Sequence, residues 1–107
     1  MTFNDYQLVA HSTSGQNSYQ NGLTMAALGL AGESGEFCDM LKKVLFHGHP
    51  LDHDAMAKEL GDILWYIAEA ASWMGKSLEE IAEQNIAKLH MRYPEGFSTD
   101  ASIHRTL

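Results

Sequence analysis

The sequence predicts an all-α fold, a bundle of four to five helices built on a central antiparallel helical hairpin. Apolar residues recur at intervals of three and four almost throughout the 107-residue chain, as they do in helices with one buried face. No segment has the composition and alternation of a β-strand, and no internal repeat is present. The length suits one domain, which we expect at residues 1–97, followed by a C-terminal tail at 98–107.

The first two helices are expected on either side of a polar loop. The first covers about residues 3–12, with Leu8 and Val9 facing inward. The segment 13–22 is rich in Ser, Asn and Gly, and it is therefore predicted to be the loop. The second helix is then expected at about 23–46.

Stop and start signals delimit the later helices. Gly48 and Pro50 end the second helix, because glycine adopts the left-handed backbone of a helix end and proline cannot continue a helix. Asp52 can cap a third helix at about 53–74. The motif SLEE is a capping box that opens a fourth helix, which ends near Met91.

The charge excludes some classes of partner. Fourteen acids against seven Lys and Arg give a net charge of −7, which argues against a nucleic-acid polymer or an anionic membrane surface. A small anionic ligand that binds together with a cation remains compatible with this negative charge. Cys38 is the single cysteine, and neither a signal peptide nor a run of about 18 apolar residues is present. We therefore expect a cytoplasmic protein, in the host cytoplasm if a phage encodes it.

Two pairs of acids lie at helical spacing. Glu33 and Glu36 belong to GLAGESGEF, and Glu59 and Asp62 belong to ELGDILWY, so each pair shares one face of its helix. The short HGHP loop predicts an antiparallel hairpin, in which residues whose numbers add to a constant lie level. A turn centred near His49 sets that constant near 98, which puts Glu36 level with Asp62.

Four clustered carboxylates need a compensating charge. Like charges raise one another's pKa, and partial burial adds a desolvation cost. An all-oxygen set of ligands favours Mg²⁺, with Mn²⁺ as a substitute, over zinc. The alternative is an ordinary solvated acidic face. Glycines beside the acids (Gly32, Gly35 and Gly61) favour the ligand site, since glycine weakens a helix unless close approach or ligand access requires it.

Two other kinds of metal site fit the sequence less well. His47, His49 and His53 gather in HGHPLDH, but no cysteine lies nearby and the spacing matches no standard zinc site, so a structural loop is favoured. A carboxylate bundle that binds two irons needs Glu-x-x-His on two helices. Neither acidic motif has a histidine at its fourth position, which argues against redox chemistry.

The pattern over residues 3–97 resembles a known family. The motif E-x-x-E is followed after 22 residues by E-x-x-D, and the segments GLAGESGEFCDMLKK, KELGDILWYIA and NIAKLHMRYPEGF occur in the same order. Together they resemble the compact single-domain members of the MazG-like, all-α nucleoside triphosphate pyrophosphohydrolases.

The resemblance implies a reaction and its site. A (deoxy)nucleoside triphosphate is hydrolysed to the monophosphate and diphosphate with Mg²⁺, as house-cleaning or control of the nucleotide pool. A purine substrate, dGTP or GTP, is expected. Glu33, Glu36, Glu59 and Asp62 would be the catalytic, metal-binding acids. The resemblance also implies a homo-oligomer, a tetramer first and a dimer second, with the bundle completed between subunits.

The resemblance also suggests contacts for the rest of the substrate. The phosphate-binding residues would be Asn85, Lys88 and Arg92, with Lys43 as an additional contact. Tyr6 and Gln7 match a segment near the base pocket of relatives. Three aromatic residues remain open between base stacking and a place in the core or a subunit interface: Trp65, Tyr66 and Trp73.

A rival interpretation from another class is a catalytically inactive helical module that binds nucleotide or a partner protein. Retention of all four acids together with Lys88 and Arg92 speaks against it.

Overall fold

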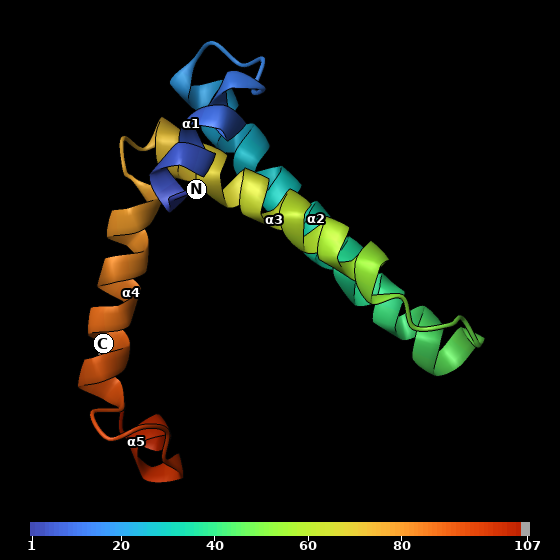
Figure 1. The fold of residues 1–107 in the computed structure, drawn as a ribbon, viewed down its shortest axis with the longest axis vertical. Helices are drawn as coiled ribbons and strands as arrows, with labels where there is room; N and C mark the ends of the chain where they lie inside the picture. The colour runs from blue at the N-terminus through green and yellow to red at the C-terminus, as the bar shows by residue number, and fades with distance from the viewer. Residues whose placement is uncertain (106–107) are drawn as a thin grey trace.

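The computed structural model describes residues 1–105 and confirms the all-α fold (Figure 1). Its helices are α1 (Phe3–Ser12), α2 (Tyr19–His47), α3 (His53–Trp73), α4 (Leu78–Arg92) and α5 (Thr99–Ile103). In this part of the chain the only β-type pairing is an isolated bridge between Pro94 and Gly96. The short helix α5 lies inside the segment expected to be a tail, the last two residues of which fall outside the described range.

The predicted caps delimit the helices. The Asp52 carboxylate accepts a hydrogen bond from the backbone N–H of Ala55 (3.0 Å) at the start of α3. Ser77 and Glu80 form the predicted capping box of α4, each side chain accepting from the other residue's backbone N–H. Gly48, with φ +71°, ends α2 in the left-handed conformation. These boundaries are local, and the sequence predicted them correctly.

The start of α2 was predicted four residues too late. The Ser18 hydroxyl accepts a hydrogen bond from the Asn21 N–H, so the helix begins at Tyr19. The composition of 13–22 was misleading because Gly22 has a packing role inside the helix. A Cβ built on Gly22 would lie 2.1 Å from a ring carbon of Trp73, so only glycine leaves room for that ring.

Two glycine–aromatic contacts set the register of the α2–α3 hairpin. Gly22 lies against Trp73, and Gly29 lies against Tyr66, where a Cβ would again come within 2.1 Å of a ring carbon. The numbers of each pair add to 95, so the predicted constant of 98 is wrong by about one helical turn. Glu33 therefore lies level with Asp62. The register follows from where large rings meet glycine, and the midpoint of the loop does not determine it.

The core lies where α1, α3 and the beginning of α4 meet. It consists of small residues and one leucine, flanked by half-buried larger side chains: Ala10, Ala68, Ala71 and Leu78, with Tyr6, Trp65, Ile67 and Ile81 around them. Figure 1 shows α1 lying across this junction, with α2 and α3 running side by side away from it.

The expected inward face of α1 is wrong. Leu8 and Val9 are 74% and 64% exposed, whereas Gln7 and Ala10 are buried. The Gln7 amide determines this orientation, because it donates to Ser72 Oγ (3.1 Å) and the Lys76 carbonyl (2.8 Å) and accepts from the Leu78 N–H (2.8 Å). Gln7 thus joins α1 to the end of α3 and the start of α4.

The helix α4 diverges from the hairpin. It packs against α1 and then extends away from α2 and α3, giving the chain an open V shape (Figure 1). Apolar side chains along α4 stay exposed, among them Ile86 at 52% and Met91 at 64%. None of the described helices has the length and apolar character needed to cross a membrane.

Candidate active site

Three of the four predicted acids converge between α2 and α3. One carboxylate oxygen each from Glu33, Glu59 and Asp62 lies within 4.8 Å of the other two. Glu59 and Asp62 are three residues apart and therefore share one face of α3. The hairpin register brings Glu33 to them from α2. Glu36 is exposed and does not join this group of three, although it is close enough for its charge to act on Glu33.

The cluster is electrostatically strained without a cation. The pKa of Glu33 is raised to about 7, chiefly because its carboxyl group is hydrogen-bonded to Glu59. Desolvation and the negative charges of Glu59, Asp62 and Glu36 raise it further. In addition, Glu59 Oε2 is buried and has no hydrogen-bond partner within the described chain. A proton shared near neutral pH and an unsatisfied buried acceptor both indicate a site that a cation would complete.

The donor set fits a hard divalent cation. It consists of carboxylate oxygens, which suit Mg²⁺ and Mn²⁺ and do not discriminate in favour of zinc or copper. Three protein carboxylates leave coordination positions for water and substrate phosphates, as Mg²⁺ usually requires. The structure therefore supports a metal site of the kind that the sequence predicted.

A cavity adjoins the acids. It has a volume of about 330 Å³, and its walls are Glu33, Asp62, Trp65 and Tyr66. Tyr6 from α1 lies near enough to be affected, because burial and then the charge of Asp62 raise the pKa of its phenol. A substrate at the acids would thus meet aromatic side chains from α3 directly and Tyr6 nearby.

The predicted phosphate-binding residues of α4 are not brought to the acids within one chain. Asn85 and Lys88 are exposed and Arg92 is half-buried, all on the arm that diverges from the hairpin in Figure 1. The Arg92 Nε is buried and has no hydrogen-bond partner in residues 1–105.

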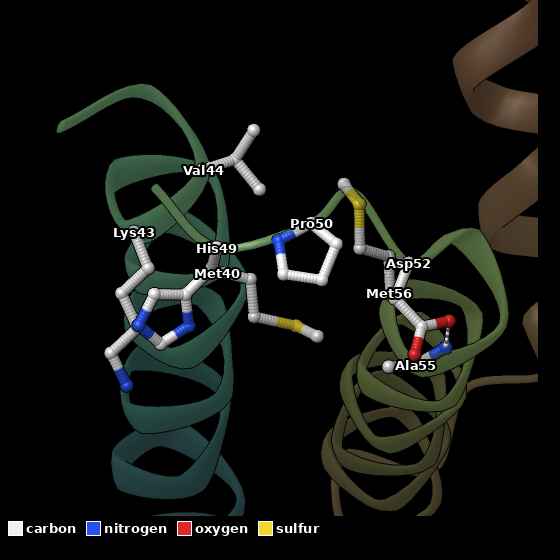
Figure 2. A pocket seen from close by; sticks show the side chains of 8 residues that line it. All are labelled: Met40, Lys43, Val44, His49, Pro50, Asp52, Ala55 and Met56. Carbon is white, nitrogen blue, oxygen red and sulfur yellow. Dashed lines mark hydrogen bonds between the residues drawn. The ribbon is translucent and has the colours of Figure 1, made fainter. Parts of the chain in front are cut away.

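Lys43 lies near the closed end of the hairpin. Its Nζ is 3.0 Å from Asp39 Oδ2, and Lys42 Nζ is 2.7 Å from Asp39 Oδ1, which lowers the pKa of Asp39 to about 2. The cavity at this end has a volume of about 330 Å³, and Figure 2 shows the side chains that line it. Its lining combines apolar and polar side chains: Met40, Lys43, Val44, His49, Pro50, Asp52, Ala55 and Met56.

Other sequence expectations are also resolved by position. The glycines beside the acids, Gly32, Gly35 and Gly61, have open space where a Cβ would stand, so no close approach within the chain requires them. Close approach occurs at Gly22 and Gly29. His47 is the last residue of α2, His49 lies in the loop and His53 is the first residue of α3; within residues 1–105 they belong to no group of three potential metal ligands.

Sequence reasoning missed a polar pair in which one partner is fully buried and the other, His11, is exposed. Glu69 is fully buried, and its Oε2 lies 2.8 Å from His11 Nδ1. Among the described residues, its other oxygen has no hydrogen-bond partner, and neither has the buried Nε1 of Trp73, whose ring lies edge-on to His11 at 5.3 Å. The signal was available, because Glu69 continues the stripe of Glu59 and Asp62 along α3.

Comparison with known proteins agrees with this geometry. Residues 20–97 match the family model described as "MazG nucleotide pyrophosphohydrolase domain". The "Gene 37 protein" of Mycobacterium phage L5 is 31% identical over 100 residues, which cover 85% of this chain and 88% of that relative. No solved structure matches the chain significantly. The family match spans the acidic hairpin and α4 together.

Proposed function

Because this chain belongs to the MazG nucleotide pyrophosphohydrolase family, we propose that it is a Mg²⁺-dependent nucleoside triphosphate pyrophosphohydrolase. In the proposed reaction, the oxygen of water bonds to a phosphorus atom and one phosphoanhydride bond breaks. A (deoxy)nucleoside triphosphate thereby yields the monophosphate and diphosphate. The observation that carries the proposal is the convergence of three carboxylates with a buried, unsatisfied oxygen.

The acids have two tasks in this reaction. Glu33, Glu59 and Asp62 would hold Mg²⁺, or Mn²⁺ as a substitute, with Glu36 as the neighbouring fourth acid. The bound metal supplies neutralisation of phosphate charge and a lower pKa for the attacking water. A carboxylate of this group accepts the proton that the water loses. The hairpin brings these oxygens together before substrate binds.

Binding of the phosphates is assigned to Asn85, Lys88 and Arg92, with Lys43 as an additional contact. The first three lie at i, i+3 and i+7 and so share a face of α4. Since α4 diverges from the acids of its own chain, this assignment requires α4 of a second copy to approach them. We propose a homotetramer, with a dimer as the second choice.

The dimensions of the chain support association. Its radius of gyration is 16.9 Å, whereas a compact chain of this length has about 13 Å. Its accessible surface is 7651 Å², about 1,700 Å² more than a compact monomer of this mass exposes. A standard interface covers about 800 Å² of each partner, so the excess corresponds to two such interfaces per chain, as in a dimer of dimers.

The base contacts are proposed for α1. Tyr6 is near Asp62 and can reach the nucleoside end of a substrate held at the acids. Gln7 contributes by holding α1, and with it Tyr6, in place, since its amide is hydrogen-bonded to the end of α3, the segment after it and the start of α4. The proposal also includes a purine substrate, dGTP or GTP, and a role in nucleotide-pool control in the cytoplasm, which is the host cytoplasm if a phage encodes the protein.

The decisive experiment is hydrolysis of a panel of (d)NTPs with and without Mg²⁺, with products separated by ion-exchange chromatography. Monophosphate and diphosphate that form only with metal are expected, and the fastest base identifies the substrate. Running the reaction in ¹⁸O-labelled water then locates the attacked phosphorus: label in the monophosphate identifies the α position, and label in diphosphate the β position.

Variants test the assignment of the acids. Glu59→Gln and Asp62→Asn should lose hydrolysis by orders of magnitude, because each removes one carboxylate from the metal site. Asp54→Asn is the matched control, an exposed acid in the first turn of the same helix. Triphosphates that survive across the panel, while nucleotide still binds, would instead establish the inactive binding module.

A further inference from the structure

The structure separates the three aromatic residues of α3 by what holds them. Trp73 lies over Gly22 and edge-on to His11, and Tyr66 lies over Gly29. Both rings are held between the two helices of the hairpin. Trp65 is held by other contacts, and together with Tyr66 it lines the cavity beside Glu33 and Asp62.

The Trp65 ring is held in a fixed orientation. Its Nε1–H donates to Thr13 Oγ1 at 2.9 Å, and that hydroxyl donates in turn to the Ala10 carbonyl at 2.7 Å. Tyr66 lies perpendicular to it, with ring centroids 4.9 Å apart. The ring also packs against the core cluster that includes Ala10 and Ala68. The segment after α1 thus orients an aromatic side chain at the acid cavity before any substrate arrives.

The distance from the acids suits a nucleoside. Asp62 and Trp65 are three residues apart, which is about 4.5 Å along the helix axis. With the phosphates at the acids, a ribose spans roughly one helical turn before the base begins. On this geometry, and resting on the proposed function, we infer that Trp65 is the residue on which the nucleobase stacks, with Thr13 as its positioning residue.

Stacking on Trp65 has a consequence for substrate range. Every nucleobase offers a π-face, so this contact supplies affinity for purines and pyrimidines alike. Discrimination between bases must then come from hydrogen-bonding groups at the base edge. The rival location for the base is a second cavity, of about 680 Å³, on the other side of Tyr66 along α2, lined by Gln20, Asn21, Thr24, Met25, Leu28 and Gly29.

A single-tryptophan protein tests the inference directly. The chain has two tryptophans, so Trp73→Phe leaves Trp65 as the sole indole fluorophore. The protein is titrated, with Mg²⁺ present, with an α,β-methylene nucleoside triphosphate and separately with inorganic tripolyphosphate. We expect the nucleotide to change Trp65 fluorescence and tripolyphosphate, which has no base, to leave it nearly unchanged.

Each other outcome overturns the inference. Equal responses to both ligands would mean that Trp65 senses only phosphate or metal. Calorimetric binding of the nucleotide without a fluorescence change would move the base elsewhere, with the α2 cavity as the next position. If Trp73→Phe hydrolyses substrate but fails this test, the inference alone is lost. If neither Trp73→Phe nor the unaltered protein binds or hydrolyses nucleotide, the proposed function fails as well.

Kinetics give an independent readout. Trp65→Ala should weaken nucleotide binding by roughly 5- to 150-fold, the range for loss of one base–aromatic stack, and leave tripolyphosphate binding unchanged. Trp65→Phe should retain most of the affinity. Thr13→Val should raise KM with little effect on kcat, and Thr13→Ser, which keeps the hydroxyl, should restore KM. Equal losses for nucleotide and tripolyphosphate in Trp65→Ala would indicate a purely structural role.

Discussion

Glu33 and Glu59 meet across the α2–α3 hairpin, and hydrogen bonding between their carboxyl groups raises the pKa of Glu33 to about 7. The ordinary value for a glutamate is 4.5. Without metal, therefore, the folded protein holds a proton near neutral pH that the unfolded chain has already released. That difference links the stability of the fold, the pH and the occupancy of the site.

The metal-free protein should lose stability as the pH rises. Between about pH 4.5 and 7 the folded state binds more protons at Glu33 than the unfolded state, so the free energy of unfolding falls through this range. The stabilisation from this proton is fully present below about pH 4.5, the ordinary pKa, and is lost above about pH 7, the raised pKa of Glu33. Thermal unfolding from pH 4 to 8 in EDTA measures the slope. Glu33→Gln, which cannot titrate, should flatten this part of it, and an unchanged slope in that variant would contradict the assignment.

Mg²⁺ should stabilise the fold above pH 7. A ligand that binds only the folded state adds about 2.7 kcal/mol at a concentration one hundred times its dissociation constant. The bound metal should therefore raise Tm, and Glu59→Gln should abolish that rise. Because Glu59→Gln removes one repelling charge, the metal-free variant should be no less stable than the unaltered protein above pH 7. Asp54→Asn should keep the rise. An equal Mg²⁺ response in both variants would show that the metal binds elsewhere.

Adding a methyl group at a hairpin glycine should have opposite effects at two positions. Gly29→Ala places a Cβ against the Tyr66 ring and should cost about 1–3 kcal/mol of unfolding free energy through overpacking. Gly35→Ala meets open space and should stabilise α2 by up to about 1 kcal/mol, since alanine favours the helix. Denaturant titration of the two variants gives the comparison. Equal destabilisation would contradict the register derived from the glycine–aromatic contacts.

Removing the Gln7 amide should loosen α1 from α3 and α4. Gln7→Ala leaves the Leu78 N–H and the Lys76 carbonyl without their side-chain partner, and we expect a loss of roughly 2 kcal/mol or more. Gln84→Ala, at an exposed position on α4, is the control and should be nearly neutral. Amide hydrogen exchange should show faster exchange at the Leu78 N–H in Gln7→Ala. Unchanged exchange there would contradict the joining role of Gln7.

Local chemistry made much of the fold predictable. The caps at Asp52 and Ser77 and the left-handed stop at Gly48 depend on residues within one helical turn, so the sequence located these ends correctly. The start of α2 was missed because the segment 13–22 has the composition of a loop, although its last residue, Gly22, lies inside the helix and packs against Trp73. A glycine alone does not reveal which ring will lie against it.

By itself, the sequence determined the all-α fold, the hairpin and the presence of paired acids at helical spacing, because each depends on periodicity and on contacts between near neighbours. The tertiary structure decided the register that brings Glu33 to Asp62, the burial of Gln7 and the orientation of Trp65 by Thr13. These features join residues that are far apart in the chain. They depend on the fit of specific side-chain shapes and hydrogen-bonding groups between helices, which a pattern along one helix does not contain.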